Sequence, residues 1–473
     1  MQERLEKLEK IRKEKGSPYS LHSFPKQASI IKVKENFSEG KEVSIGGRLF
    51  NRREHGKSIF FDLGDFSGRI QCYLKKDLIG EDNFSFFKNL DIGDILGVKG
   101  SLFKTKTAEV TVLVSEFKLL SKSLRPLPEK WHGLKDTELR FRKRYLDLIA
   151  NPQVSSLFIK RSKLISKIRE FLDNQGFIEV ETPFLHLIPG GASGRPFKTH
   201  HNALDIDIYL RIAPELYLKR LLVGGFDKIY ELGRSFRNEG ISLKHNPEFT
   251  MLEVYCTYQD YTFMMELAEK LIRTLAKEVS PTGVINYQGF SIDFNQEFKK
   301  ISLASKLKED LGIEFDAGPA EFIRKARQHF DIKDNLSRSQ IIKLIEDLIE
   351  EKYFGGEPVF VTDFYTWMSP LAKTKKDNPN LAERFELFIG GIELANAYSE
   401  LNDPIEQRER FLKQIDSEEI SSKVDEDFIE SLEYGMPPAA GLGIGIDRLV
   451  MLLLNQPSLK EVIFFPLLKP QDK

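Results

Sequence analysis

The stretch FRNEGISLKHNPEFTMLEVY, residues 236–255, joins a polar loop to a strand-like segment with two different faces. Alternation along a strand separates Phe249, Met251, Glu253 and Tyr255 from Leu252, Val254 and Cys256. The second set is apolar and suits a core, whereas the first is aromatic and acidic and suits a ligand surface. Arg237 lies where the preceding strand, DKIYELGRSFR, enters the loop, which can bind phosphate through charge-assisted bonds. A solvated hairpin tip is the alternative.

A second segment, GLGIGIDRLVMLLLN at 441–455, has glycine at every other position of a predicted strand. Gly441, Gly443 and Gly445 leave one face as bare backbone, which indicates close approach by a flat ligand or by another packed element. Arg448 then falls near the N-terminus of an apolar helix, where a cation opposes the helix dipole by about 0.3–1 kcal/mol. That cost favours a functional role, such as nucleotide binding.

A third segment, RFELFIGGIELANAYSELNDP at 384–404, carries acids around a tight turn. Gly390-Gly391 fits a two-residue hairpin, which places Glu386 and Glu393 diagonally on one face. Such carboxylates repel each other unless a cation lies between them, and their hard oxygens suit Mg²⁺. An exposed hairpin with two harmless acids is the alternative. Downstream, the polar residues at a spacing of two are Asn396, Tyr398 and Glu400.

A fourth segment, GFIEVETPFLHLIPGGASGRPF at 176–197, predicts a strand, a proline turn and a glycine-rich loop. RIAPELYLKRLLVGG follows at 211–225 and contains Glu215, which alone could simply be a carboxylate favoured at a helix N-terminus. The adjacent histidines His200 and His201 do not predict a metal site, because neighbouring residues of a strand point apart.

The front of the chain is basic and β-rich. Five short strands are predicted between about 40 and 120, in EVSIGGRLF, SIFFDLGD, GRIQCYL, DILGVKGSLF and EVTVLVSEFKLL. Residues 1–130 carry 25 Lys and Arg against 18 Asp and Glu, and the remainder 45 against 53. An OB-type barrel that binds single-stranded nucleic acid fits this pattern. Another small barrel with a solubilising charge bias remains possible at this point.

The predicted fold class is α+β, with several domains. We expect an N-terminal helical extension at 1–39, with a charged helix ending at Gly16, and an OB-type domain at 40–124. A linker at 125–140 precedes a body at 141–473, built on an antiparallel sheet with a helical insertion at about 262–354. The two cysteines, Cys72 and Cys256, suit a reducing compartment. The longest apolar run, LVMLLL, is too short to cross a membrane, so we expect a cytoplasmic protein.

Three of these segments, EVETPFL, FRNEG through PEFTMLE, and GLGIGIDR, resemble the three motifs of class II aminoacyl-tRNA synthetases in order and spacing. Within that class, the chain resembles the lysine-specific enzymes from about residue 40 to its end. The segments that carry this are RPLPEKWHGLKDTELRFRKRYLDLI, IPGGASGRPF, RIAPELYLKRL, RNEGISLKHNPEFT and ANAYSELNDP. The resemblance implies an anticodon-binding OB domain, a class II catalytic domain, and a homodimer with the first motif at the subunit contact.

The resemblance also implies substrates and residue roles. The expected partners are ATP, L-lysine and tRNA(Lys), with Mg²⁺ as cofactor. Arg237 would hold the α-phosphate, and Phe249 would stack on adenine with Arg448 on its other side; these two arginines are the expected catalytic residues. The remaining nucleotide contacts would be Glu239, His245 and the Mg²⁺ ligands Glu386 and Glu393. The lysine site would comprise Gly191, Glu215, Glu253, Tyr255, Asn396, Tyr398 and Glu400. The anticodon contacts would be Arg53, Phe60 and Gln71.

One geometric consequence is testable. On an ideal strand Glu393 and Asn396 have opposite parity, so a single site containing both requires a β-bulge between them. The chain also departs from the family pattern. Tyr365 stands where many relatives have proline, and Lys244 where some have arginine. Ala395 and Ala397 replace glycines of many bacterial relatives, which is expected to narrow the lysine pocket.

Other functions predict other residues. An aspartate or asparagine enzyme would need a cation facing the substrate side chain, whereas Glu215 and Glu400 suit an ammonium. Protein-lysylating relatives lack the front barrel that is predicted here. A nucleic-acid-binding protein with an inactive synthetase body would not need an intact set of Arg237, Arg448, Glu386 and Glu393.

Overall fold

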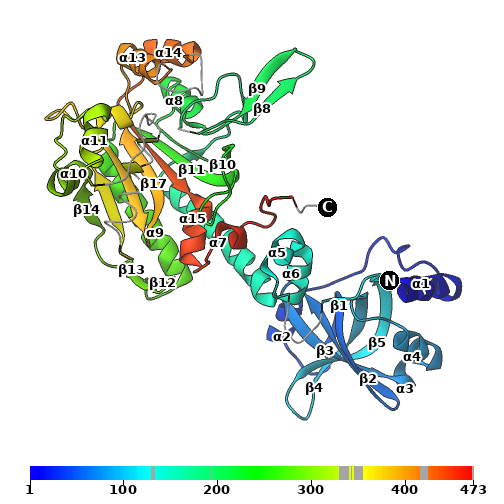
Figure 1. Cartoon of the computed structure of the whole chain (residues 1–473). Coiled ribbons are helices and arrows are strands. Elements are labelled where there is room, and N and C mark those ends of the chain that lie inside the picture. Colours follow the sequence, from blue (N-terminus) through cyan, green and yellow to red (C-terminus); the bar gives the residue numbers. More distant parts are fainter. Residues whose placement is uncertain are drawn as a thin grey trace. The chain divides into compact units, whose positions relative to one another are not determined.

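The computed structural model describes residues 1–128, 134–192, 194–329, 340–341, 344–345, 355–415 and 424–470. The chain forms two compact units, Met1–Leu157 and Phe158–Lys473 (Figure 1). Residues 129–133 of the linker proposed at 125–140 lie outside the described residues. In the described part, no helix combines the length and apolarity needed to cross a bilayer.

The first unit contains the predicted five-stranded barrel. Its strands are β1 (Glu42–His55), β2 (Ser58–Asp65), β3 (Gly68–Lys75), β4 (Ile95–Lys104) and β5 (Val110–Ser121). They close in the order β1-β2-β3-β5-β4, which confirms the OB architecture. Alternation sends side chains such as Ile45, Leu63 and Cys72 into a fully buried core. The unit also contains the helices α2 (Ile30–Glu35), α3 (Lys76–Ile79), α4 (Glu81–Lys88), α5 (Thr137–Arg142) and α6 (Arg144–Ala150).

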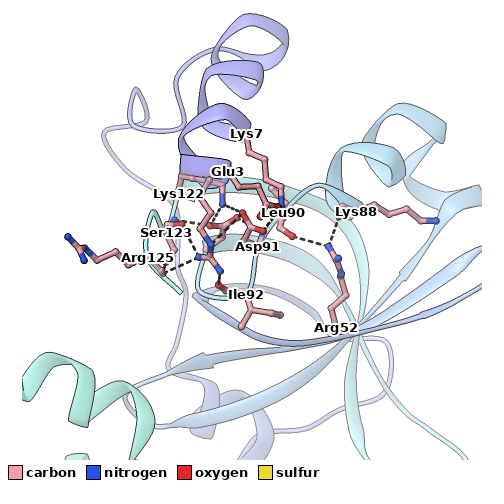
Figure 2. Close-up of polar contacts among 12 residues, drawn as sticks. Glu3, Lys7, Arg52, Lys88, Leu90, Asp91, Ile92, Lys122, Ser123 and Arg125 are labelled. Carbon is pink, nitrogen blue, oxygen red and sulfur yellow. Dashed lines mark hydrogen bonds and ion pairs between the residues drawn. The ribbon is translucent and has the colours of Figure 1, made fainter. Parts of the chain in front are cut away.

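The predicted N-terminal helix, α1 (Gln2–Lys15), ends at Gly16 with a positive φ of 85° and is bonded to the barrel. The Arg4 guanidinium donates to the carbonyl oxygens of Ile92, Ser123 and Arg125 at 3.0–3.1 Å. Figure 2 shows the Lys7 and Lys122 ammonium groups converging on Asp91, at 2.8 and 2.5 Å. Burial raises the pKa of Asp91, but the two ammonium groups outweigh it and hold the pKa below its ordinary value. The helix is therefore fixed to the barrel by charge.

The second unit is built on one eight-stranded sheet in the order β14-β15-β16-β17-β18-β11-β10-β6. The six central strands pair antiparallel, as predicted, whereas the edge strands β14 and β6 pair parallel and make the sheet mixed. The strands are β6 (Ile178–Glu179), β10 (Lys228–Phe236), β11 (Glu248–Thr257), β14 (Lys299–Ser302), β15 (Val359–Thr362), β16 (Arg384–Ile389), β17 (Ile392–Ser399) and β18 (Ala439–Gly445).

Smaller elements complete this unit. A three-stranded sheet contains β7 (Leu185–His186), β9 (Ile206–Leu210) and β8 (Lys198–His201), and a hairpin contains β12 (Val284–Tyr287) and β13 (Phe290–Asp293). The helices are α7 (Pro152–Asn174, which begins in the first unit), α8 (Glu215–Val223), α9 (Tyr261–Val279), α10 (Leu303–Leu311), α11 (Pro319–Ala326), α13 (Pro404–Ile415), α14 (Glu426–Glu433), α15 (Ile446–Leu453), α16 (Leu459–Val462) and the 3₁₀ turn η1 (Thr366–Met368).

The two faces of the sheet have different coverings. Helices α9 and α15 pack against β17 and β18 (Figure 1), and buried residues such as Leu252, Val254, Leu442 and Ile444 form the core there. Ala395 and Ala397 are paired with Ile444 and Leu442 on this same face. The expectation that these alanines narrow the lysine pocket is therefore wrong, because strand alternation directs them away from Asn396 and Tyr398.

The segment predicted as a helical insertion, about 262–354, is more varied than expected. It includes most of α9, which covers the sheet, and β14, which forms its edge, together with β12, β13, α10 and α11. Residues 330–339, 342–343 and 346–354 lie outside the described residues. Tyr365 has φ −64°, a value that proline also adopts, and its ring is buried, so the departure at this turn keeps the backbone direction.

The hairpin between β16 and β17 confirms two predictions. Gly390 and Gly391 form its turn with φ of 62° and 71°, the left-handed values that a tight hairpin favours. Leu387 pairs with Ala395 and Phe388 with Glu393, so Leu394 is an extra residue in β17. This bulge lies between Glu393 and Asn396, as the parity argument requires. Asn396 is thereby opposite Glu386, and Glu386, Glu393 and Asn396 share one face.

Candidate active site

The face of the sheet opposite α9 groups polar residues that are remote in sequence. In one row, Glu253 of β11 is paired with Gly443 of β18, which is paired with Asn396 of β17 and through it with Glu386 of β16. The neighbouring row contains Tyr255, Gly441, Tyr398 and Arg384. Paired residues point to the same side of a sheet. Five predicted site residues and Arg384 therefore lie on one surface, around the bare backbone of the glycines.

The glycines make room for different neighbours. A Cβ atom on Gly441 would lie 2.2 Å from Glu400 Oε1 and 2.5 Å from Tyr255 Cε1. One on Gly443 would lie 3.2 Å from Met251 Cε, and one on Gly445 would make only ordinary contacts with Arg448. At Gly441, the element that approaches the backbone is thus the side chains of the predicted lysine site. Gly441 is therefore explained by close packing of neighbouring side chains and not by the approach of a flat ligand.

Replacing Gly441 with alanine should impair lysine binding. The new methyl group must displace the Tyr255 ring and the Glu400 carboxylate, and overpacking of this kind costs about 1–3 kcal/mol. We expect the lysine KM in ATP–pyrophosphate exchange to rise about tenfold or more, with the ATP KM nearly constant. Gly445→Ala is the matched control. Equal effects of the two variants on lysine KM would contradict this role of Gly441.

Three of the predicted lysine-site residues, Glu215, Tyr398 and Glu400, meet directly or through one shared ammonium group. Glu215, the first residue of α8, is buried and accepts a hydrogen bond from Tyr398 Oη at 2.7 Å. Lys219 Nζ donates to the same Glu215 oxygen, Oε1, at 2.8 Å and also pairs with Glu400 Oε2. Sequence reasoning missed Lys219, although it lies in RIAPELYLKRL one turn after Glu215.

The other predicted members of the lysine site surround this group. Tyr255 Oη donates to Glu253 Oε2 at 3.0 Å. Gly191 has φ 86°, and a Cβ there would lie only 3.1 Å from Glu215 Cβ, so both conformation and space require glycine. We call Glu215, Glu253 and Glu400 the acid cluster. All three carboxylates are at most 6% exposed.

Burial perturbs the protonation of this region. It raises the pKa of Glu253 to about 8, and the neighbouring Glu215 adds to the effect. Burial also raises the pKa of Glu400, against the opposing influence of Lys219. The pKa values of Tyr255 and Tyr398 are raised by burial and by the surrounding acids, so both phenols stay neutral donors. The acid cluster thus holds less than its full formal charge near neutral pH.

The predicted nucleotide residues gather around Arg448, in the first turn of α15. Its Nη1 donates to the carbonyl oxygen and to Oε2 of Glu393, at 2.9 and 3.0 Å. Nη2 lies 3.0 Å from His245 Nε2, and Nε donates to the Lys244 carbonyl oxygen at 3.3 Å. Lys244 in turn donates to Gly391 O at 2.9 Å. The pairing with Glu393 offsets the cost of a cation at this helix end.

Arg237 and Phe249 lie side by side, with the guanidinium carbon 5.2 Å from the ring centroid. Arg237 Nε is buried and donates to no acceptor among the described residues. Burial lowers the pKa of Arg237, while Glu239 and Glu393 oppose that shift. Glu239 itself is exposed in the loop that follows. A buried guanidinium donor without a bond suits an anionic ligand.

The two predicted Mg²⁺ ligands are not bonded to each other. Glu386 is buried and paired with Arg384, whereas Glu393 is paired with Arg448. Arg384 also donates from Nε to Asn396 Oδ1 at 3.1 Å, so it connects the predicted metal and lysine sites. Sequence reasoning missed Arg384, although it opens the RFELF segment. Within the described ranges, no group of three His, Cys, Asp or Glu side chains is arranged for a metal ion.

The barrel carries an aromatic and basic face. Arg53 of β1 is paired with Phe60 of β2, which is paired with Tyr73 of β3, so the three share one side of the barrel. Phe60 is half-buried, and its ring stacks on Tyr73 with centroids 4.3 Å apart. Gln71 is buried, donates to Glu109 at 3.3 Å and accepts from Thr111 at 3.1 Å. Tyr73, two residues after Gln71, extends the predicted set.

Replacing Phe60 with alanine should weaken binding of tRNA by roughly 1–3 kcal/mol through lost stacking on a base. Exchange of pyrophosphate into ATP without tRNA should be unchanged, because Phe60 belongs to the barrel unit. Filter binding with tRNA(Lys) measures the first effect. Phe66→Ala, an exposed aromatic in the β2–β3 turn, is the control. If Phe60→Ala harms activation as much as charging, Phe60 is a structural residue.

Comparisons with known proteins agree with this geometry. Residues 136–469 match the model of the tRNA synthetases class II (D, K and N), and residues 43–120 match the OB-fold nucleic acid binding domain. A lysine–tRNA ligase of Thermoanaerobacter sp. (strain X514) is 52% identical, covering 99% of this chain and 96% of the relative.

Further relatives carry the same name. The lysine–tRNA ligase of Carboxydothermus hydrogenoformans is 52% identical over 99% of this chain and 98% of its own length. That of Clostridium novyi is 47% identical over 99% and 94%. With the barrel, the sheet and the motif residues in place, the chain belongs to the class II tRNA synthetases, in the family of the lysine–tRNA ligases.

Proposed function

We propose that the chain activates L-lysine with ATP to lysyl-adenylate and transfers the lysyl group to the 3′ end of tRNA(Lys). One observation carries the choice of amino acid. Glu215 and Glu400 converge within the active face, buried and linked through Lys219, where an ammonium can be held by carboxylates. With a neutral or acidic substrate side chain, these two acids would have to share the single positive charge of Lys219.

The activation step needs no nucleophile from the protein. The carboxylate of lysine attacks the α-phosphorus of ATP, a phosphorus–oxygen bond forms, and pyrophosphate leaves. Arg237 neutralises the charge that develops on the α-phosphate, and its buried Nε supports that role. Phe249 stacks on adenine with Arg448 on the other side, and Glu239 and His245 contact the nucleotide. Positioning and charge thus supply the catalysis.

The residues of the β16–β17 hairpin fit Mg²⁺. Glu386 and Glu393 point to the same face of the sheet, and Mg²⁺ is usually held by one or two carboxylates together with substrate phosphates. Magnesium bound there would offset phosphate charge and favour the departure of pyrophosphate. The two strands of this hairpin carry two carboxylates, Glu386 and Glu393. The phosphates of ATP would supply further oxygen ligands to the magnesium ion, so the protein need not fill its coordination shell alone.

In the second step, a ribose hydroxyl at the 3′ end of the tRNA attacks the adenylate carbonyl, and AMP leaves. Gly191, Glu253, Tyr255 and Asn396 surround the bound lysine, and Tyr398 flanks its stem. On the barrel, Arg53, Phe60 and Gln71 contact anticodon bases. Both free cysteines are buried thiols, which suits the reducing cytoplasm where tRNA is charged.

A homodimer would cover apolar surface in the second unit. Phe184 and Leu185, at the end of the segment that resembles the first motif, and Leu187, two residues beyond it, are 42–65% exposed in the single chain. Large apolar side chains exposed close together in the sequence suit a protein interface. Leu187→Asp should shift the molar mass measured by light scattering from two chains toward one. Leu412→Asp, on α13, is the control. An unchanged dimer in Leu187→Asp would place the interface elsewhere.

ATP–pyrophosphate exchange measured with each of the twenty amino acids tests the proposed function. Lysine alone should support rapid exchange, and the same preparation should charge tRNA(Lys). Exchange with aspartate or asparagine would assign a related enzyme. If lysine supports exchange but the lysyl group is transferred to a protein and not to tRNA, the chain is a protein-modifying enzyme. If no amino acid supports exchange, the synthetase domain is inactive.

A further inference from the structure

Lys219 is a cation inside a site whose substrate is itself a cation. It lies on α8 one helical turn after Glu215, and its side chain is 0% exposed. Its ammonium donates to Glu215 Oε1 at 2.8 Å and pairs with Glu400 Oε2. The reaction described above assigns no role to this group.

Stability alone does not explain a buried ammonium. Burial lowers the pKa of Lys219, but Glu215 and Glu400 outweigh it, so the side chain stays charged. A buried ion pair generally contributes no more to folding than apolar residues of similar volume. If position 219 served only to fill the core, an apolar residue there, with neutral residues at positions 215 and 400, would stabilise the fold equally well.

The bonds leave one oxygen of each carboxylate away from Lys219. In Glu215, Lys219 and Tyr398 both bond Oε1, so Oε2 takes a bond from neither. In Glu400, the Lys219 ammonium forms an ion pair with Oε2 and Oε1 lies toward Gly441, and neither buried oxygen receives a well-oriented hydrogen bond from the described residues. Lys219 therefore fixes both carboxylates through one oxygen and leaves the other for a ligand.

Charge balance leads to the same conclusion. The acid cluster brings three carboxylates around the single positive charge of Lys219. Burial raises the pKa of Glu253 and of Glu400, each to about 8, so the negative charge of the site is reduced near neutral pH. A substrate ammonium adds a second positive charge and favours the ionised form of these acids. The other groups that face these carboxylates are Tyr255, Tyr398, Glu231 and Arg211. Without Lys219, ionised carboxylates would be crowded together, and they would take up protons instead of binding lysine.

We propose that Lys219 is a specificity-determining positioning residue, whose buried ammonium orients Glu215 and Glu400 and offsets the repulsion between them, so that both face one substrate ammonium. This inference rests on the proposed activation of lysine. It assigns Lys219 no contact with the reacting atoms. It predicts that lysine selectivity depends on a charge that the substrate does not touch directly.

Lys219→Met tests the proposal in ATP–pyrophosphate exchange between pH 6 and 9. Lysine KM at pH 7 should rise about tenfold or more, with the ATP KM unchanged, because protonated carboxylates bind an ammonium weakly. The KM should recover toward the parent value as pH rises, since deprotonation restores the acids while the ε-ammonium, with its ordinary pKa near 10.4, remains charged. The ratio of kcat/KM for lysine over norleucine, which lacks the ammonium, should fall about tenfold.

Lys270→Met is the matched control, because Lys270 also pairs with a glutamate one turn away, but on the exposed surface of α9. If Lys219→Met does not fold, Lys219→Met combined with Glu400→Gln removes one buried charge of each sign and leaves Glu215 as the carboxylate that Lys219 would position. Its lysine KM should then exceed that of Glu400→Gln, but by less than tenfold. A pH profile and selectivity ratio like the parent's, or additive effects in the double variant, would overturn the role of Lys219. A parent enzyme without lysine exchange would instead overturn the proposed function.

Discussion

Replacing Arg237 with alanine should slow lysine-dependent exchange of pyrophosphate into ATP by about 10²–10³-fold. The loss of one preorganised donor to a developing negative charge typically costs about 2.7–4 kcal/mol in the transition state. The structure supplies the reason for expecting a value in this range. Arg237 Nε is buried without a bond from any described residue, so the guanidinium is held ready for an anion and its removal breaks no fold-stabilising hydrogen bond of that atom.

Arg234→Ala is the control for this variant. Arg234 lies on β10, which ends one residue before Arg237, but its side chain is 39% exposed and pairs with Glu248 at 3.5 Å, a surface pair of little energetic weight. Thermal unfolding of both variants should resemble that of the parent. Near-normal exchange in Arg237→Ala would show that Arg237 does not bind the α-phosphate. Arg448 would then be the next arginine to test.

Sequence patterns predicted those features that depend on neighbours along the chain. The five barrel strands, the hairpin at Gly390-Gly391 and the helix that ends at Gly16 each follow from local alternation or turn chemistry. The bulge at Leu394 was also predictable, because two residues required on one face had opposite parity. Local rules of this kind depend only on spacing.

Features that depend on pairing between distant segments could not be predicted in this way. Lys219 meets Glu400 only because α8 is close to the end of β17, and Arg384 meets Glu386 and Asn396 only because their strands pair. The direction of Ala395 and Ala397 was misjudged, because residues flanking a site residue on a strand face away from the site. The parallel edge strands β6 and β14 were also beyond local patterns, since β6 has only two residues.

Glu400→Gln should raise the lysine KM sharply and leave the ATP KM almost unchanged. Glutamine keeps the shape of the side chain but removes its charge, so the variant separates electrostatics from packing. Truncating one partner of a buried charge pair typically costs about 2–5 kcal/mol, which corresponds to a rise in KM of roughly 30-fold or more. Glu400 is 0% exposed, so water cannot replace the lost carboxylate.

The interpretation of Glu400→Gln depends on its effect on folding, because Lys219 loses one of its two carboxylate partners. Thermal unfolding should therefore be measured beside the kinetics, with Glu406→Gln, a pair at the surface with Arg410, as the control. A folded variant with a high lysine KM would place the substrate ammonium at Glu400. If folded Glu400→Gln binds lysine as tightly as the parent does, the ammonium is held elsewhere. Glu253 would then be the next carboxylate to test, because it is buried in the same acid cluster and bonded to Tyr255.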